Sequence, residues 1–141
     1  AGELALPAGD TPEPFVDADD IAAVAVAALT DDRHIGQLYE LTGPRLLTFA
    51  QAVTEIAEAT GREIQYVPIS VDDFASALRA QQVPPEDIEL LAYLFTEVLD
   101  GRNARLADGV QRALGREPRD FSNYARDAAA TGVWDPAAVA V

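Results

Sequence analysis

The sequence predicts an α/β domain in which about three strands form the edge of a mainly parallel sheet and a helical region follows. The chain has 141 residues, of which 49% are hydrophobic and 24% charged, as in a globular domain with a buried core. Short apolar runs alternate with helical periodicity in its first half, which is typical of parallel strand–helix units. A free-standing doubly wound sheet usually has about five or six strands. The predicted strands therefore look like the trailing edge of a larger sheet.

The first strand and the first helix are predicted within residues 1–30. Residues 2–6 (GELAL) form a short apolar run that ends at Pro7, and residues 7–14 (PAGDTPEP) are rich in turn-forming residues. From Asp17 to about Leu29, apolar residues recur at helical spacing, mostly as alanine. The aspartates at its start suit a helix N-terminus, where unpaired amides and the helix dipole favour negative charge.

Two more strands and a second helix are predicted within residues 37–69. Residues 37–42 (QLYELT) alternate and predict a strand. Thr48 and Gln51 form a capping-box pattern before a helix over 49–60. Residues 63–69 (EIQYVPI) predict a third strand, which Pro68 confines to an edge or an end.

The remainder, residues 70–134, is predicted to be helical, whereas residues 1–69 supply the strand–helix units. Helices are expected over 70–81, 86–99, 108–114 and 120–131, and residues 135–141 are a tail. The helix over 86–99 is apolar on more than half of its circumference. A surface helix needs only one apolar stripe, so this helix is expected to be sandwiched or to line a pocket or an interface.

Composition excludes several classes of function. With 24 acidic and 10 basic residues, the net charge of −14 gives no cationic surface for nucleic acid or for an anionic membrane. All basic residues except His34 are arginines, so no lysine nucleophile or Tyr-x-x-x-Lys pair exists. The chain has no cysteine and one histidine, which argues against a metal site and against hydrolase chemistry. We expect a cytoplasmic protein.

Charged residues that could form a site also have simpler interpretations. Asp17, Asp19 and Asp20 could bind a cation, but helix capping explains them better. Five arginines between residues 102 and 119 could face an anionic substrate, but pairing with the chain's own carboxylates is favoured. His34 lies among charged residues and is expected to be a solvated loop histidine.

Four short sequence motifs in a fixed order resemble the C-terminal half of NmrA-like proteins, which are NAD(P)-binding, atypical relatives of the short-chain dehydrogenases/reductases. The likeness extends from about residue 4 to Trp134. The motifs are Phe15-Val16-Asp17-x-Asp19-Asp20-Ile21-Ala22, Tyr39-x-Leu41-Thr42-Gly43-Pro44, Leu47-Thr48 and Leu114-Gly115-Arg116-x-Pro118-x-x-Phe121.

The resemblance implies a Rossmann-type fold and a parent protein that binds NADP or NAD. The glycine spacing of this chain allows no G-x-G-x-x-G turn, so the main cofactor site is expected to be absent here. By resemblance, Pro7, Phe15 and Val16 lie on the cofactor side of the cleft. By the same resemblance, the helical region over residues 70–134 is expected to bind substrate, with Tyr93 and Phe95 as the expected walls of the substrate pocket.

Two functions remain open at this point. In the first, the chain is the substrate-binding part of an NAD(P)H-dependent reductase of a quinone or small carbonyl compound, or of a redox sensor. Its expected partners are then a small-molecule substrate and a missing N-terminal Rossmann half. The alternative is a non-catalytic module that forms a homodimer or completes a partner's sheet, since exposed sheet edges associate.

Overall fold

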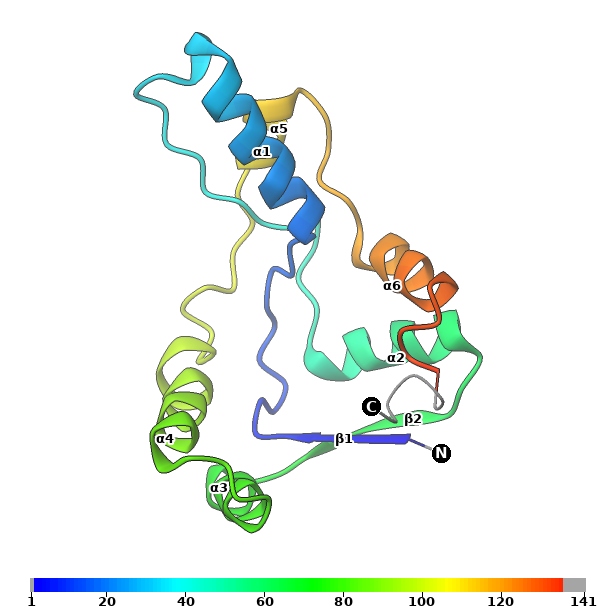
Figure 1. Ribbon diagram of the computed structural model, residues 1–141. Coiled ribbons are helices and arrows are strands. Elements are labelled where there is room, and N and C mark those ends of the chain that lie inside the picture. Colours follow the sequence, from blue (N-terminus) through cyan, green and yellow to red (C-terminus); the bar gives the residue numbers. More distant parts are fainter. Residues whose placement is uncertain (1, 136–141) are drawn as a thin grey trace. The chain divides into compact units, whose positions relative to one another are not determined.

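The computed structural model describes residues 2–135 and contains a two-stranded parallel sheet with helices between and after its strands (Figure 1). The chain forms two compact units, each built from two separate stretches. The first unit comprises Ala1–Glu13 and Leu47–Ala104, and the second comprises Pro14–Leu46 and Arg105–Val141. The α/β class predicted from the sequence is confirmed.

The sheet belongs to the first unit. Strand β1 (Gly2–Leu6) pairs in parallel with β2 (Ile64–Pro68), with Gly2 opposite Ile64 and Leu6 opposite Pro68. Helix α2 (Phe49–Thr60) packs against β2 and begins with the predicted capping box between Thr48 and Gln51. Parallel strands need such a crossover, because the chain must return to the same end of the sheet.

Two further helices complete the first unit. Helix α3 (Val71–Ala80) is capped by Ser70 and packs against α4 (Pro85–Tyr93), which continues as a π-helical turn, η2 (Leu94–Val98). The single helix predicted over 86–99 is therefore correct in place but changes its winding at Leu94. Phe95 in η2 lies 5.5 Å from Phe74 and 6.3 Å from Phe49, measured between ring centroids, so three helical segments share one aromatic cluster.

The second unit contains α1 (Ala18–Thr30), a short 3-10 turn η1 (Asp32–His34), α5 (Gly109–Leu114) and α6 (Phe121–Ala130). Helix α1 packs against α5, and the small residues on its inner side permit close approach. The buried apolar side chains of this unit include Val24, Val110, Ala113 and Ala125.

The strand predicted over residues 37–42 is wrong: among the described residues the sheet has two strands rather than three. This segment runs beside the chain that leads into α5 instead of beside a strand. The Glu40 carbonyl accepts from the Gly109 amide at 3.2 Å, and the Thr42 hydroxyl bonds both backbone groups of Ala107. Leu38 is 85% exposed, so the alternation in the sequence does not reflect one buried face.

The predicted functional boundary between residues 69 and 70 falls inside the first unit, because both units are discontinuous in sequence. The assignment of substrate binding to residues 70–134 stays a prediction. Of the predicted tail over 135–141, all but Asp135 lies outside the described residues.

Candidate functional site

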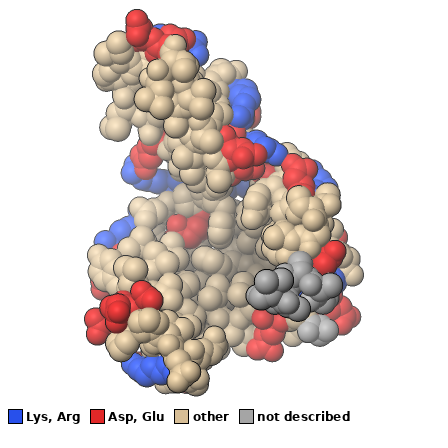
Figure 2. Space-filling view, viewed as in Figure 1, with Lys and Arg blue, Asp and Glu red and all other residues tan. Residues whose placement is uncertain are grey.

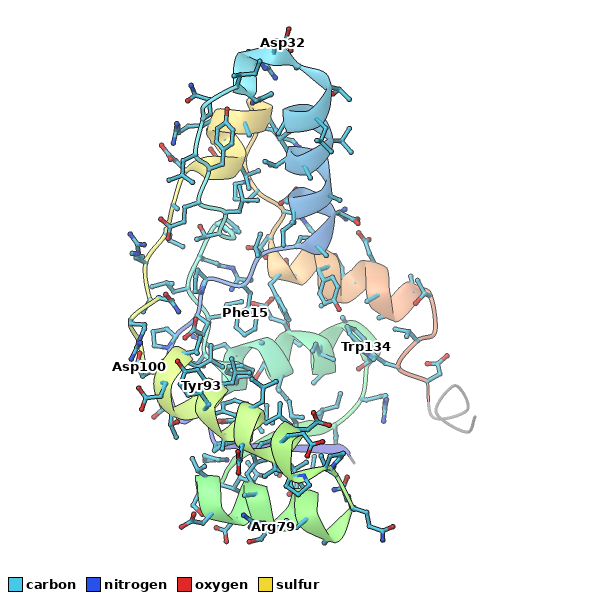
Figure 3. All side chains as sticks on the ribbon, turned by 60° about the vertical axis from the view of Figure 1, so that its left-hand side comes forward. Phe15, Asp32, Arg79, Tyr93, Asp100 and Trp134 are labelled. Carbon is cyan, nitrogen blue, oxygen red and sulfur yellow. The ribbon has the colours of Figure 1, made fainter. Side chains whose placement is uncertain are left out.

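The second unit contains an aromatic pocket of about 280 Å³ at the start of α1. Phe15, which precedes α1 in the chain (Figure 3), lines this pocket, and its ring centroid lies 5.4 Å from that of Phe121. The Phe121 ring lies 5.6 Å from Tyr124, which in turn lies 6.1 Å from Trp134. The residues that line the pocket are Phe15, Val16, Asp17, Ala18, Arg119, Phe121 and Tyr124.

The beginning of α6 positions two of these rings. Asp120 caps the helix by accepting from the Ser122 amide, and its carboxylate also receives two hydrogen bonds from Arg45, at 2.7 and 2.8 Å. The Arg45 guanidinium is the main reason that the pKa of Asp120 lies well below its usual range. Because Phe121 and Tyr124 are three residues apart on this helix, their rings share one face.

A close backbone contact fixes the other wall. The Gly43 amide donates to the Pro14 carbonyl at 3.4 Å, and the chain passes so near Phe15 that a Cβ atom on Gly43 would overlap the Phe15 carbonyl oxygen. Gly43 is therefore needed for close approach, and it holds the Phe15 backbone where the ring can face Phe121.

The arginine in the wall of this pocket is paired with carboxylates of the chain itself. Arg119 contributes to the lining, but its guanidinium contacts Asp17 at 3.2 Å, Asp19 at 2.8 Å and Asp127 at 2.7 Å. A guanidinium with three carboxylate partners has little charge left for an anionic ligand. The pocket is thus suited to a neutral, flat, apolar molecule that stacks on aromatic rings.

The predicted site residues fall in both units. Phe15 and Val16 are brought together in the aromatic pocket. Pro7 follows β1 in the first unit, in a turn that the Tyr66 hydroxyl holds by donating to the carbonyls of Leu6 and Gly9, both at 3.3 Å.

The two predicted substrate residues lie in the first unit and differ in exposure. Tyr93, at the end of α4, is 55% exposed (Figure 3). Phe95 packs within the aromatic cluster of Phe49 and Phe74. Their assignment to substrate, and that of Pro7, Phe15 and Val16 to cofactor, stay predictions.

Sequence reasoning missed Phe121, Tyr124 and Arg119 as pocket residues. A signal was present: aromatic residues at positions one and four after the helix-capping Asp120 must share a face of α6. What was not visible is that this face meets Phe15, about a hundred residues earlier in the chain.

The predicted pairing of arginines with the chain's own carboxylates is confirmed. Asp20 is completely buried and accepts from Arg116 Nη2 at 2.7 Å and from the Arg119 amide at 2.6 Å. Arg102 pairs with Asp100, whose pKa its hydrogen bonds lower to about 2, and Arg105 pairs with Glu40. Acidic and basic side chains accordingly lie next to one another at several places on the surface (Figure 2).

The expectation that His34 is a solvated loop residue is wrong. His34 is only 6% exposed, and its Nδ1 lies 2.7 Å from the Tyr39 hydroxyl. The short turn η1 folds the ring back against Tyr39, which the local charge density of the sequence does not reveal. Within residues 2–135, no group of three or more histidine, aspartate or glutamate side chains could hold a metal ion. None of the helices described is long and apolar enough to cross a membrane.

Glu13 in the first unit is a buried carboxyl group. It is 8% exposed, and its Oε1 atom has no hydrogen-bond partner among the described residues. Burial, and secondarily the negative charge of Asp100, raise the pKa of Glu13 above its ordinary value of 4.5. The ionised carboxylate therefore opposes folding.

We expect Glu13→Gln to stabilise the chain at pH 8 by about 0.5–1 kcal/mol, because the amide carries no charge to desolvate. Since the pKa is raised in the folded state, the penalty is present above the folded pKa and disappears as the pH falls below the unfolded value. Urea unfolding of both proteins from pH 8 to pH 4 measures this, with the exposed Glu3→Gln as the control. If the difference in unfolding free energy between Glu13→Gln and the original chain widens toward pH 4, Glu13 is not a carboxyl group with a raised pKa.

Comparison with known proteins identifies relatives among the oxidoreductases. The uncharacterized oxidoreductase YesF of Bacillus subtilis is 36% identical over 135 residues, which cover 94% of this chain and 47% of YesF. An NAD(P)H azoreductase of Xenophilus azovorans is 33% identical over 129 residues, which cover 92% of this chain and 45% of the azoreductase. No family model matches the chain.

Comparison of the fold with solved structures also finds reductases. A crystal structure of an NADPH-dependent quinone oxidoreductase of Escherichia coli superimposes with a TM-score of 0.77 at 24% identity, over 90% of this chain and 46% of that protein. The chain is thus an oxidoreductase relative with part of a Rossmann-type fold. Within that class, it is related to the C-terminal half of the NmrA-like, NAD(P)-binding proteins, as its motifs indicate. It spans about half the length of the curated relatives it matches.

The described residues do not fit the pyrophosphate of a dinucleotide. Such a site needs free amides at a helix N-terminus directly after a strand. Both strand-to-helix connections in this chain instead place carboxylates or a capping hydroxyl there. These side chains are Asp17, Asp19 and Asp20 on the way into α1, and Ser70, Asp72 and Asp73 on the way into α3.

Proposed function

We propose that this chain is the acceptor-binding part of an NAD(P)H-dependent reductase and that the cofactor's phosphates bind to a part of the protein outside it. The observation that carries the proposal is the charge-matched aromatic pocket formed by Phe15, Phe121 and Tyr124. Relatives named as an NAD(P)H azoreductase and an NADPH-dependent quinone oxidoreductase support a flat, unsaturated acceptor such as a quinone or a small carbonyl compound. We keep the cytoplasm as the expected location.

The roles of individual residues follow from their chemistry. Phe15 and Val16 are apolar, so they suit contact with a nicotinamide ring rather than with phosphates. Pro7, in the first unit, is also apolar, and its assignment to the cofactor is kept as a proposal for that unit by itself. Phe121 and Tyr124 offer ring faces to the acceptor. Tyr93 is a second candidate for acceptor contact because more than half of it is exposed, while Phe95 is half-buried and packs against Phe74.

Titration of the 141-residue chain with 1,4-naphthoquinone and with NADPH tests the proposal. We expect saturable binding of the quinone, with NMR shift changes at Phe121 and Tyr124, and no saturation by NADPH at about 1 mM. Phe121→Leu removes the stacking surface but keeps an apolar side chain, and should weaken quinone binding about tenfold. Calorimetry gives the affinities, and Trp134 fluorescence gives an independent signal for NADPH.

Tyr93→Leu is the comparison variant, since it makes the same aromatic-to-leucine change at the candidate acceptor contact in the other unit. Weakening by Tyr93→Leu but not by Phe121→Leu would move the acceptor site to α4. Micromolar binding of NADPH would show that this chain holds the cofactor, and would overturn the proposal that the cofactor's phosphates bind outside it.

A second candidate function, an association module, is favoured by the sheet. Within the described residues, β1 and β2 pair only with each other, and each therefore has an open edge. Parallel sheets are normally larger and covered on both faces. Large apolar side chains are also exposed, among them Leu29 at 86% and Ile35 at 74%. Another strand-bearing segment, from the Rossmann half or from a second copy, would complete the sheet.

Light scattering over a dilution series separates the two candidates. A stable dimer that binds neither quinone nor NADPH favours the association module. A monomer that binds quinone favours the acceptor-binding part of a reductase.

A further inference from the structure

The second unit holds another cavity, of about 300 Å³, which is lined by Arg33, His34, Gln37, Tyr39 and Arg112. It lies at the far end of α1 from the aromatic pocket: Phe15 precedes the helix and Asp32 follows it (Figure 3). A helix of 13 residues is about 20 Å long. The polar cavity is therefore a separate site from the one described above.

The buried His34 and the half-buried Tyr39 contact each other in the lining of this cavity. Arg33 Nε lies 3.2 Å from His34 Nε2 and donates to it, so Nε2 carries no proton. The proton of the neutral ring is then on Nδ1, which donates to the Tyr39 hydroxyl oxygen at 2.7 Å. With its oxygen accepting this bond, the Tyr39 hydroxyl keeps its own proton, and no acceptor within residues 2–135 takes it. Tyr39 thus offers one directed donor to the cavity.

The two arginines add charged donors on either side. Arg112 lies over the Tyr39 ring, 5.3 Å from its centroid, and its Nη1 contacts the Leu38 carbonyl at 3.4 Å and Asp108 at 3.9 Å. Arg33 contacts Asp31 at 3.1 Å through Nε and the Ala113 carbonyl at 3.4 Å through Nη2. Among the residues that the structure describes, no carboxylate lines the cavity.

We propose that this cavity binds the phosphate group of a small phosphorylated molecule. Two guanidinium groups and a phenol supply donors only, which suits the oxygens of a phosphate group. Each arginine contacts one carboxylate, Asp31 or Asp108, and neither carboxylate is among the residues that line the cavity. The cationic pair is notable in a chain of net charge −14, where an anion would otherwise be repelled. The competing explanation is that Arg33 and Arg112 only offset the negative ends of η1 and α5, since each lies in a last turn.

Titration of the full chain with inorganic phosphate at constant ionic strength, followed by ¹H–¹⁵N NMR, distinguishes these explanations. We expect saturable shifts at residues 33–39 and at Arg112, with a dissociation constant of about 1 mM. Arg112→Gln should weaken binding about tenfold or more. Arg102→Gln removes the same charge from an arginine that pairs with Asp100 in the first unit, and should change the affinity less than about twofold.

Tyr39→Phe keeps the ring beneath Arg112 and removes only the hydroxyl, so it tests the site even where an arginine variant folds poorly. It should weaken phosphate binding roughly threefold to tenfold. Shifts that do not saturate by about 50 mM phosphate, or that sodium chloride reproduces, overturn the proposal. They would support the competing explanation, in which the two arginines only offset the negative ends of η1 and α5. Acetate that binds as tightly as phosphate overturns the assignment to phosphate.

Discussion

Asp20→Asn is expected to lower the free energy of unfolding by about 3 kcal/mol. The Asp20 carboxylate is completely buried and joins two distant parts of the chain, by accepting from the Arg116 guanidinium at 2.7 Å and from the Arg119 amide at 2.6 Å. An asparagine has only one acceptor oxygen, and its NH₂ group must face a donor. One buried donor is then left without a partner, which costs more than the loss of an exposed ion pair.

Urea unfolding followed by circular dichroism measures this effect, and Asp19→Asn is its matched control. The Asp19 side chain is 77% exposed and shares Arg119 with two other carboxylates, so the control should cost less than about 1 kcal/mol. Equal losses in the two variants would show that Asp20 acts only through the charge of the first turn of α1, as the sequence-based interpretation held.

Gly43→Ala is expected to cost about 3 kcal/mol or more and to abolish ligand binding in the aromatic pocket. A Cβ atom at position 43 would overlap the Phe15 carbonyl oxygen, which is backbone and cannot rotate away. The chain must therefore shift at Phe15 and break the hydrogen bond from the Gly43 amide to the Pro14 carbonyl. Because Phe15 faces Phe121, the shift also opens the pocket wall.

Gly36→Ala is the control for the general cost of replacing a glycine. Gly36 has a φ of +73°, but a Cβ atom there meets nothing within 4 Å, so only the left-handed backbone is strained, at about 1 kcal/mol. Unfolding and quinone titration of both variants give the two readouts. If Gly43→Ala is no more harmful than Gly36→Ala, the close approach to Phe15 is not what shapes the pocket.

Local signals in the sequence were sufficient to predict the helices. Thr48 caps its helix as predicted, and Asp17, Ser70 and Asp120, each the first residue of a predicted helix, also act as caps, since a capping side chain bonds an amide two or three residues away. Interactions within a few residues can be deduced without knowing the fold. The same holds for the strands at 2–6 and 64–68, which apolar runs and Pro68 delimit well.

The segment over 37–42 and His34 show where local signals fail. The alternation in QLYELT satisfies the rule for a strand, but a strand also needs a neighbour, and this segment lies beside residues 105–109. His34 is surrounded by charged residues in sequence, yet a tight turn returns its ring to Tyr39. Both outcomes depend on partners that sequence spacing does not specify.

The sequence by itself determined the α/β class, the helix boundaries, the relation to NAD(P)-binding reductases and the absence of a glycine-rich dinucleotide turn. Only the tertiary structure decided which side chains form a site. Phe15 meets Phe121, and Arg33 meets the same cavity as Arg112, across about eighty to a hundred residues of chain. Helix capping and periodicity act within one or two turns, whereas a pocket is formed by long-range packing, and its lining is fixed only when the separate stretches of a unit have folded together.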